Sequence, residues 1–214
     1  MTVLLQTGKR ERGINGLTSY QRTRRYVIGA MLFLLAGLLM FVSSSQPELT
    51  HAHIEGFGLA LMLIGIGGRL WSILYIGGRK SAEVVDIGPY SMTRNPLYFF
   101  SAVAAAGVGA QIGSWVMAII FGVLCWAAFT VVIRREEKFL ASELGQTFRD
   151  YLASTPRFFP NPLLYRDRPE VTFKPSVWNR TLMDGLVFVL AVPIFEAIEY
   201  GQQTGFLPIL LHLP

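Results

Sequence analysis

The stretch that decides the fold is LYFFSAVAAAGVGAQIGSWVMAIIFGVLCWAAFTVVI, residues 97–133, which contains no charged residue. A membrane-spanning helix needs about 20 mostly apolar residues, so this stretch is too long for one crossing. The polar break Gln111-Ile112-Gly113-Ser114 divides it near the middle. We therefore predict a tight helical hairpin that returns the chain to the side of the membrane from which it started.

Three further apolar stretches, residues 26–44, 54–76 and 182–198, have the length and composition of spanning helices. Residues 206–213 are too few to cross, and we expect them to lie in the interface or to cap the last helix. Open strand edges cannot face hydrocarbon, so we expect no sheet. The fold class that follows is all-α: a polytopic membrane helix bundle with about five transmembrane helices, including the hairpin.

The composition agrees with this fold class. Hydrophobic residues make up 52% of the 214 residues and charged residues only 15%, whereas a soluble domain usually carries about 25% charged residues. We expect one domain over residues 1–214. It divides into a basic tail (1–25), four helices (26–133), a polar segment (134–180), and the last helix with its tail (181–214).

Lysine and arginine are placed very unevenly. Of the 19 such residues, 18 fall in three segments, the N-terminal tail, the loop before the hairpin and the segment after it. The positive-inside rule puts these segments in the cytoplasm. We expect a multi-pass protein of the bacterial inner membrane with a cytoplasmic N-terminus. The basic face suits anionic lipid headgroups or reflects topology alone, and it requires no nucleic acid partner.

Two polar segments flank the hairpin and should be neighbours in space. The first is GPYSMTRNPLY, residues 88–98, and the second begins with RREEK, residues 134–138. Asn95-Pro96 is typical of a helix start, and the free N–H groups there attract a carboxylate or phosphate. Glu136 and Glu137 could hold a cationic or hydroxyl-rich ligand. The alternatives are a simple helix cap with an interfacial tyrosine, and a solvated charge cluster.

Taken together, these segments resemble the isoprenylcysteine carboxyl methyltransferase and phospholipid methyltransferase superfamily. Its pattern is approximately G-x-Y-x-x-x-R-H-P-x-Y, then two glutamates after a helical hairpin, then G-x-x-[FY]-x-x-Y and a downstream Pro-Arg. The resemblance covers about residues 60 to 160. The matching residues, in order, are Gly88, Tyr90, Arg94, Pro96, Tyr98, Glu136, Glu137, Gly145, Phe148, Tyr151, Pro156 and Arg157.

The resemblance implies a membrane-embedded methyltransferase that binds S-adenosylmethionine in a cytoplasmic pocket. The acceptor would be lipophilic, with a carboxylate, thiol or lipid headgroup as the reacting group. Asn95 stands where the family usually has histidine; asparagine can hydrogen-bond but cannot act as a general base near neutral pH. Arg157 and Tyr151 would close the pocket or meet the acceptor. The residues implied for the cofactor are Tyr90, Arg94, Asn95, Pro96, Tyr98, Glu136, Glu137 and Tyr151.

Outside these segments, Arg69 is unusual because it lies within the second span. It could be a partner for an acidic acceptor group or for the glutamate pair, or it could snorkel to the interface. Glu196 and Glu199 should lie in a wet interface at the far side or line a second polar cavity. The three histidines also fall on the far side with no recognisable carboxylate cluster, so we predict no metal site.

Two other classes of protein remain open from the sequence. The first is an NADPH-dependent membrane reductase of the sterol reductase type, which the short chain and the glutamate pair disfavour. The second is a non-catalytic membrane protein with a relict pocket, which the asparagine at position 95 would suit. The sequence does not identify the acceptor or the oligomeric state.

Overall fold

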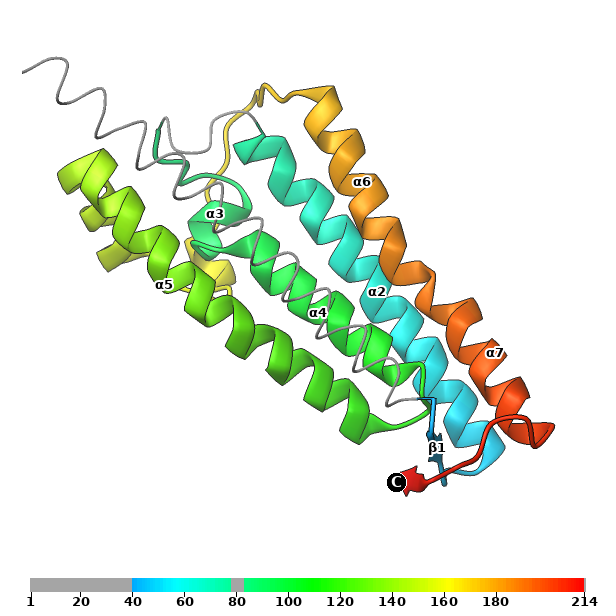
Figure 1. The fold of residues 1–214 in the computed structure, drawn as a ribbon. Coiled ribbons are helices and arrows are strands. Elements are labelled where there is room, and N and C mark those ends of the chain that lie inside the picture. The colour runs from blue at the N-terminus through cyan, green and yellow to red at the C-terminus, as the bar shows by residue number, and fades with distance from the viewer. Residues whose placement is uncertain (1–39, 78–82, 214) are drawn as a thin grey trace, which may run out of the picture.

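The computed structural model describes residues 40–77 and 83–213, and in this part of the chain the fold is a bundle of long helices (Figure 1). Helix α2 (Glu48–Ile76) packs against α4 (Pro96–Ala110), and α4 packs against α5 (Trp115–Ser154). Helices α6 (Pro175–Val189) and α7 (Ala191–Gln203) continue the row on the other side of α2. Most of the predicted span 26–44, namely residues 26–39, lies outside the described residues.

The predicted hairpin is confirmed. Helix α4 ends at Ala110, α5 begins at Trp115, and the intervening turn contains Gly113 at φ +69°. This backbone conformation is readily adopted by glycine. The imidazole of His51 also lies where a β-carbon on Gly113 would be, with Nδ1 2.3 Å from that position. The turn therefore needs glycine for both its backbone conformation and its packing.

Small residues set the close contact between α2 and α4. A β-carbon added to Gly65 would lie 2.6 Å from the Ala104 side chain and 2.7 Å from the Phe100 carbonyl oxygen. A β-carbon added to Gly68 would likewise overlap the Phe100 ring, whereas one added to Gly67 would have nothing within 4 Å. Two of the three clustered glycines thus allow the helices to approach closely, as in other membrane bundles.

The fourth helix is much longer than the sequence indicated. We expected it to end near Ile133, but α5 runs on into the polar segment as far as Leu144, and a second helical stretch follows the break at Gly145 and ends at Ser154. Gly145, at φ +64°, produces a kink inside it. The apolar pattern marks where the helix leaves hydrocarbon; helix-forming residues beyond that point extend it into water.

The last span is divided into two helices. Helix α6 starts at Pro175, seven residues before the predicted span, and α7 starts at Ala191. Pro193 accounts for the division, because it has no N–H to donate to the carbonyl of Val189 and its ring crowds that carbonyl. Together the two helices are long and apolar enough to cross a membrane.

The expectation of no sheet is wrong for two short segments. Strand β1 (Val42–Ser44) pairs in parallel with β2 (Leu211–Leu213), and the amide of Ser45 extends the pairing to Leu213. Residues 40–44, predicted to end the first span, therefore form a turn and a strand. The segment after α7 also caps that helix, as expected, through a hydrogen bond from the Leu207 amide to the Gly201 carbonyl.

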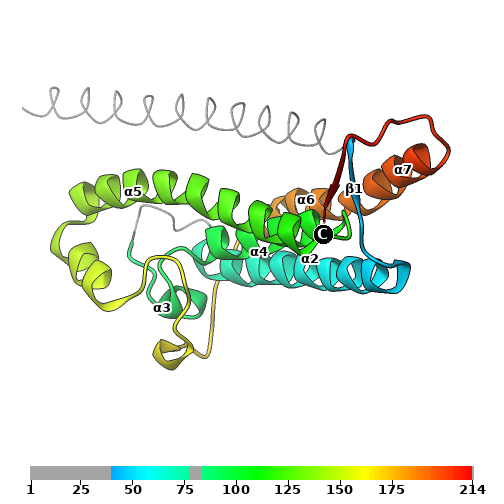
Figure 2. The ribbon, with the colours of Figure 1, turned by 90° about the horizontal axis from the view of Figure 1, so that it is seen from below.

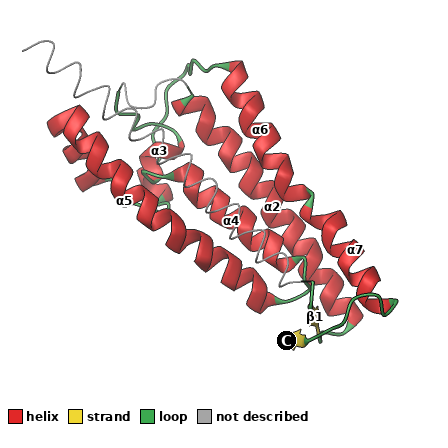
Figure 3. Cartoon of the chain, in the orientation of Figure 1, coloured by secondary structure: helices red, strands yellow, loops and turns green. Residues whose placement is uncertain are grey.

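Within residues 40–77 and 83–213, three helical units are long and apolar enough to span a membrane, namely Glu48–Ile76, Trp115–Ser154 and Pro175–Gln203, and α4 is a shorter apolar helix. The bundle has two distinct ends (Figure 2). We call one the α3 end, because it carries the short helix α3 (Pro89–Met92) and the 3₁₀ turn Pro162–Leu164. The other is the β1 end, with the two strands and the hairpin turn. Figure 3 shows that loops are confined largely to these ends.

Candidate functional site

A cleft at the α3 end brings the two predicted polar segments together. It is bounded by residues 83–98 on one side and by α5 on the other, and its enclosed part has a volume of about 90 Å³. Every residue that the resemblance assigned to a cofactor lines this cleft: Tyr90, Arg94, Asn95, Pro96, Tyr98, Glu136, Glu137 and Tyr151. Apolar side chains of Leu140, Leu144 and Phe148 complete the wall contributed by α5.

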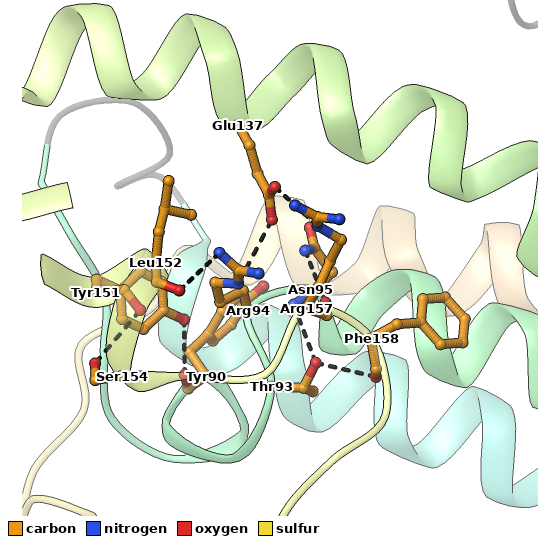
Figure 4. A network of polar contacts seen from close by, with 10 residues as sticks. All are labelled: Tyr90, Thr93, Arg94, Asn95, Glu137, Tyr151, Leu152, Ser154, Arg157 and Phe158. Carbon is orange, nitrogen blue, oxygen red and sulfur yellow. Dashed lines mark hydrogen bonds and ion pairs between the residues drawn. The ribbon is translucent and has the colours of Figure 1, made fainter. Parts of the chain in front are cut away.

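Glu137 is the charged centre of the cleft (Figure 4). Its carboxylate lies 3.0 Å from Nε of Arg157 and 3.5 Å from Nε of Arg94, and the residue is only 8% exposed. Arg94 also donates from Nη1 to the carbonyl of Leu152 at 3.1 Å. The two arginines that meet this carboxylate come from distant loops, one before α4 and one after α5.

Residues 93–95 are joined to residues 156–158 by a ladder of hydrogen bonds. The Arg94 amide donates to the Pro156 carbonyl at 2.8 Å, and the Asn95 side-chain amide donates to the Arg157 carbonyl at 2.9 Å. The Thr93 hydroxyl donates to the Phe158 carbonyl at 3.0 Å. Asn95 therefore fixes the loop that carries Arg157 in place, a task that needs an amide donor and no titrating group.

Two buried tyrosines close the floor of the cleft. The Tyr151 hydroxyl donates to the Tyr90 carbonyl at 2.7 Å. The Tyr90 hydroxyl itself is buried and has no hydrogen-bond partner among the described residues. Burial raises the pKa of Tyr90 well above its ordinary value, so the hydroxyl remains protonated and able to donate. A buried unpaired hydroxyl costs free energy, and a bound ligand could satisfy it.

A polar contact beside the cleft was not predicted from the sequence. The Tyr75 and Tyr165 hydroxyls both donate to the Asp167 carboxylate, at 2.8 Å and 2.6 Å. These contacts, with the Arg166 carbonyl accepting from the Gly88 amide at 2.6 Å, hold the 165–167 segment against α3. No local pattern signals them, because Tyr75 and Asp167 lie 92 positions apart.

The two residues assigned to acceptor positioning lie in different places. Arg157 is half-exposed beside the cleft and touches it through Glu137. Arg69 does not line the cleft; its Nη1 donates to the Ser101 hydroxyl of α4, and its guanidinium lies 5.8 Å from the centre of the Phe188 ring. Arg69 thus does not pair with Glu136 or Glu137, and its contacts join α2, α4 and α6.

The far-side residues form a cluster that sequence reasoning missed. His51 Nε2 lies 3.1 Å from a Glu55 oxygen and 3.9 Å from a Glu199 oxygen, and the three potential ligand atoms all lie within 4.8 Å of one another. The reasoning that no carboxylate accompanies the histidines is therefore wrong. The i, i+4 spacing of His51 and Glu55 could have signalled half of the cluster.

Comparison with known proteins now adds to this geometry. The model of the phospholipid methyltransferase family matches residues 24–147. The nickel-cobalt-cadmium resistance protein NccN of Alcaligenes xylosoxydans xylosoxydans is 31% identical, covering 89% of this chain and 91% of that protein. The cobalt-zinc-cadmium resistance protein CzcN of Cupriavidus metallidurans is 32% identical, and the match covers 82% of this chain and 81% of CzcN.

More distant relatives are named as methyltransferases. Protein-S-isoprenylcysteine O-methyltransferase A of Arabidopsis thaliana is 26% identical over 64% of this chain and 75% of that enzyme. No solved structure matches the chain. The family match, these methyltransferases and the apolar helices support a membrane methyltransferase. The chain belongs to the phospholipid methyltransferase family of integral membrane proteins.

Proposed function

We propose that this protein is an S-adenosylmethionine-dependent methyltransferase of the bacterial inner membrane. The cleft at the α3 end would hold the cofactor and open to the cytoplasm, where nearly all of the lysine and arginine residues are expected. The acceptor would be a lipophilic molecule that carries a carboxylate, a thiol or a lipid headgroup. The N-terminus would lie on the same side as the cleft.

The observation that carries this proposal is the convergence of two distant segments on one cleft. Eight residues from segments 88–98 and 134–151, all of which the family resemblance assigns to the cofactor, line the same cavity. A solvated charge cluster would not bury Glu137 between two arginines taken from separate loops. The enclosed volume is below the usual range of about 300–1,000 Å³ for ligand pockets, so a whole cofactor would need the open side of the cleft as well.

Each group of the cofactor has a suitable partner in the cleft. The N-terminus of α4 offers the Leu97 backbone N–H and the positive end of the helix dipole for a carboxylate. Glu136 offers a carboxylate for an ammonium or for ribose hydroxyls, and the Tyr98 ring offers an aromatic face for a sulfonium, worth about 0.5–2 kcal/mol. The Tyr90 hydroxyl would donate to an acceptor atom of the ligand. We assign Glu137 to positioning, because its carboxylate already holds Arg94 and Arg157.

The residues of this site suit methyl transfer to an acidic acceptor. When bound, the cofactor would supply an electrophilic methyl group on a positively charged sulfur. The protein then needs to align donor and acceptor and to exclude water, and alignment alone can supply about 7–11 kcal/mol. No histidine is among the residues that line the cleft, so it holds no imidazole to remove a proton from an amine, which favours a carboxylate or thiolate acceptor. Arg157, partly exposed beside the cleft, could hold such an anion.

An apolar groove supports a lipophilic acceptor. It has a volume of about 550 Å³ and lies between α2, α4 and α5, with Phe99, Trp126, Phe158 and Phe159 at its α3 end. Phe158 directly follows Arg157, so the groove and the cleft share one loop. A hydrocarbon chain in the groove would place its polar end close to Arg157.

Calorimetric titration of the purified protein with S-adenosylhomocysteine tests this proposal. We expect saturable binding, and we expect Glu136→Gln to weaken it at least several-fold because it removes a charge from the cleft wall. Glu143→Gln is the matched control, since Glu143 is an exposed glutamate of the same helix. Absence of binding to the wild-type protein, or equal effects of the two substitutions, would contradict the proposal.

A role in metal resistance is a second candidate, favoured by the names of NccN and CzcN, which match more than 80% of this chain. Under this proposal the methyltransferase would modify a membrane component needed for tolerance to divalent metals. Deleting the gene should lower growth in nickel, cobalt or cadmium. Rescue by the wild-type gene but not by the Glu136→Gln variant would show that tolerance depends on the cleft. Rescue by both genes would show that tolerance does not depend on Glu136 and would contradict this second proposal.

A further inference from the structure

We propose that His51, Glu55 and Glu199 form a binding site for a divalent transition-metal cation at the β1 end. His51 and Glu55 lie one turn apart on α2, and Glu199 comes from α7. The site lies at the end of the bundle opposite the cleft (Figures 1 and 2), so it goes beyond the proposed methyl transfer. It supplies one imidazole nitrogen and two carboxylates.

The spacing of the three side chains fits a single small ion. Nitrogen and oxygen ligands at about 2.0–2.1 Å from a tetrahedral zinc ion are about 3.3 Å apart. The separations of His51 Nε2 from the two carboxylate oxygens are 3.1 Å and 3.9 Å, which bracket this value. All three ligand atoms lie within 4.8 Å of one another. Small side-chain rotations would therefore complete the coordination, leaving a fourth position for water.

The carboxylates at this end provide negative charge that a bound cation could neutralise. Glu196 is close enough to act on Glu55 together with Glu199, so three carboxylates share the region. No lysine or arginine occurs in residues 26–68, 95–133 or 181–214. A half-buried group of carboxylates is destabilised by mutual repulsion, which His51 offsets only when its imidazole is protonated. A divalent ion would neutralise two of these charges.

The surroundings hold the imidazole in place. The His51 ring packs against Gly113 of the hairpin turn, and the Ser44 hydroxyl donates to the Gly113 carbonyl at 2.8 Å. The Gln111 side-chain amide donates to the Glu55 carbonyl at 3.0 Å. A cavity of about 30 Å³ lies against His51 and Glu199, which is more than the roughly 10–15 Å³ that a cavity needs to hold one water molecule. The site is thus formed by four separate elements and has room for an ion with one water.

The ligand set favours zinc, cobalt or nickel over magnesium and calcium. An imidazole nitrogen suits the late first-row metals, whereas magnesium and calcium prefer oxygen ligands in larger number. The absence of cysteine among the three ligands disfavours copper(I), which prefers sulfur. Zinc and cobalt(II) are therefore suitable probes, and cobalt(II) reports its coordination through visible absorption.

Titration of the full-length protein in detergent, with any purification tag removed, tests the inference. We expect one equivalent of zinc to bind with a dissociation constant well below 1 mM, and cobalt(II) to give visible bands that zinc abolishes. His51→Ala and Glu199→Gln should each weaken binding at least tenfold. His53→Ala is the matched control, because His53 is an exposed histidine on the same helix, and it should leave binding unchanged.

The result of the zinc titration can be distinguished from the result of the S-adenosylhomocysteine titration. Equal loss of zinc binding in the His51 and His53 variants, or no binding by the wild-type protein, would overturn the inference. Binding retained in the Glu199→Gln variant would also overturn it, and this variant keeps the test valid if His51→Ala fails to fold. Failure of S-adenosylhomocysteine to bind would contradict the proposed function and leave the zinc titration unaffected, because the two sites share no residue.

Discussion

Replacing Glu137 with glutamine should destabilise the protein by about 3 kcal/mol. The substitution keeps the shape of the side chain and removes the charge that holds Arg157 at 3.0 Å and Arg94 at 3.5 Å. Breaking a buried ion pair by neutralising one partner costs about 3–5 kcal/mol. We take the lower end of this range because the Arg157 side chain is 44% exposed, and water screens an exposed charge.

Thermal unfolding in detergent, followed by circular dichroism, measures this effect. A loss of about 3 kcal/mol corresponds to a fall in Tm of about 6–12 °C for a chain of this size. Glu143→Gln, on the exposed face of the same helix, should change Tm by less than about 2 °C because surface substitutions rarely exceed 0.5 kcal/mol. If the Glu137 variant melts within 2 °C of the control, the carboxylate does not hold the two arginines and our account of the cleft is wrong.

Three further changes test the packing, the cleft and the loop beside it. Gly65→Ala should lower stability by about 1–3 kcal/mol because its β-carbon would meet α4, whereas Gly67→Ala, with open space around it, should be neutral or stabilising in the same thermal measurement. Tyr90→Phe should keep the wild-type Tm but weaken S-adenosylhomocysteine binding about 2- to 10-fold in calorimetry, the effect of one hydrogen bond; unchanged affinity would exclude the hydroxyl as a ligand contact. Hydrogen bonds from the Tyr165 hydroxyl, a backbone N–H and the Tyr75 hydroxyl lower the pKa of Asp167, so its stabilising effect is present above about pH 4 and is lost as the pH falls further. The Tm of Asp167→Asn should therefore lie below that of the wild type at pH 7 and converge with it in acid; a constant difference would contradict this assignment.

The sequence predicts the parts of the fold that depend on local pattern. The polar break at Gln111–Ser114 located the hairpin turn, and Asn95-Pro96 marked the start of α4. Pro193 is a local signal for the division between α6 and α7. The end of α5 was misplaced because hydropathy locates the membrane boundary, whereas the helix continues past that boundary to the break at Gly145 and helical structure resumes up to Ser154.

Contacts between distant segments could not be predicted in the same way. The resemblance placed Glu137 in the cleft, but only the fold shows that Arg94 and Arg157 share its carboxylate. Likewise, His51 and Glu55 form a readable i, i+4 pair, while Glu199 joins them only because α7 packs beside the start of α2. Such pairings depend on how helices dock, which hydropathy and spacing leave open.

The central claim, that a methyl donor binds in the cleft at the α3 end, is tested most directly by locating the bound cofactor. Ultraviolet crosslinking of radiolabelled S-adenosylmethionine to the purified protein, followed by peptide mapping, gives that location. Our account predicts label in residues 83–98 or 136–151, with competition by S-adenosylhomocysteine. Label confined to residues 40–60 or 190–213 at the β1 end, or no competable label, would contradict it.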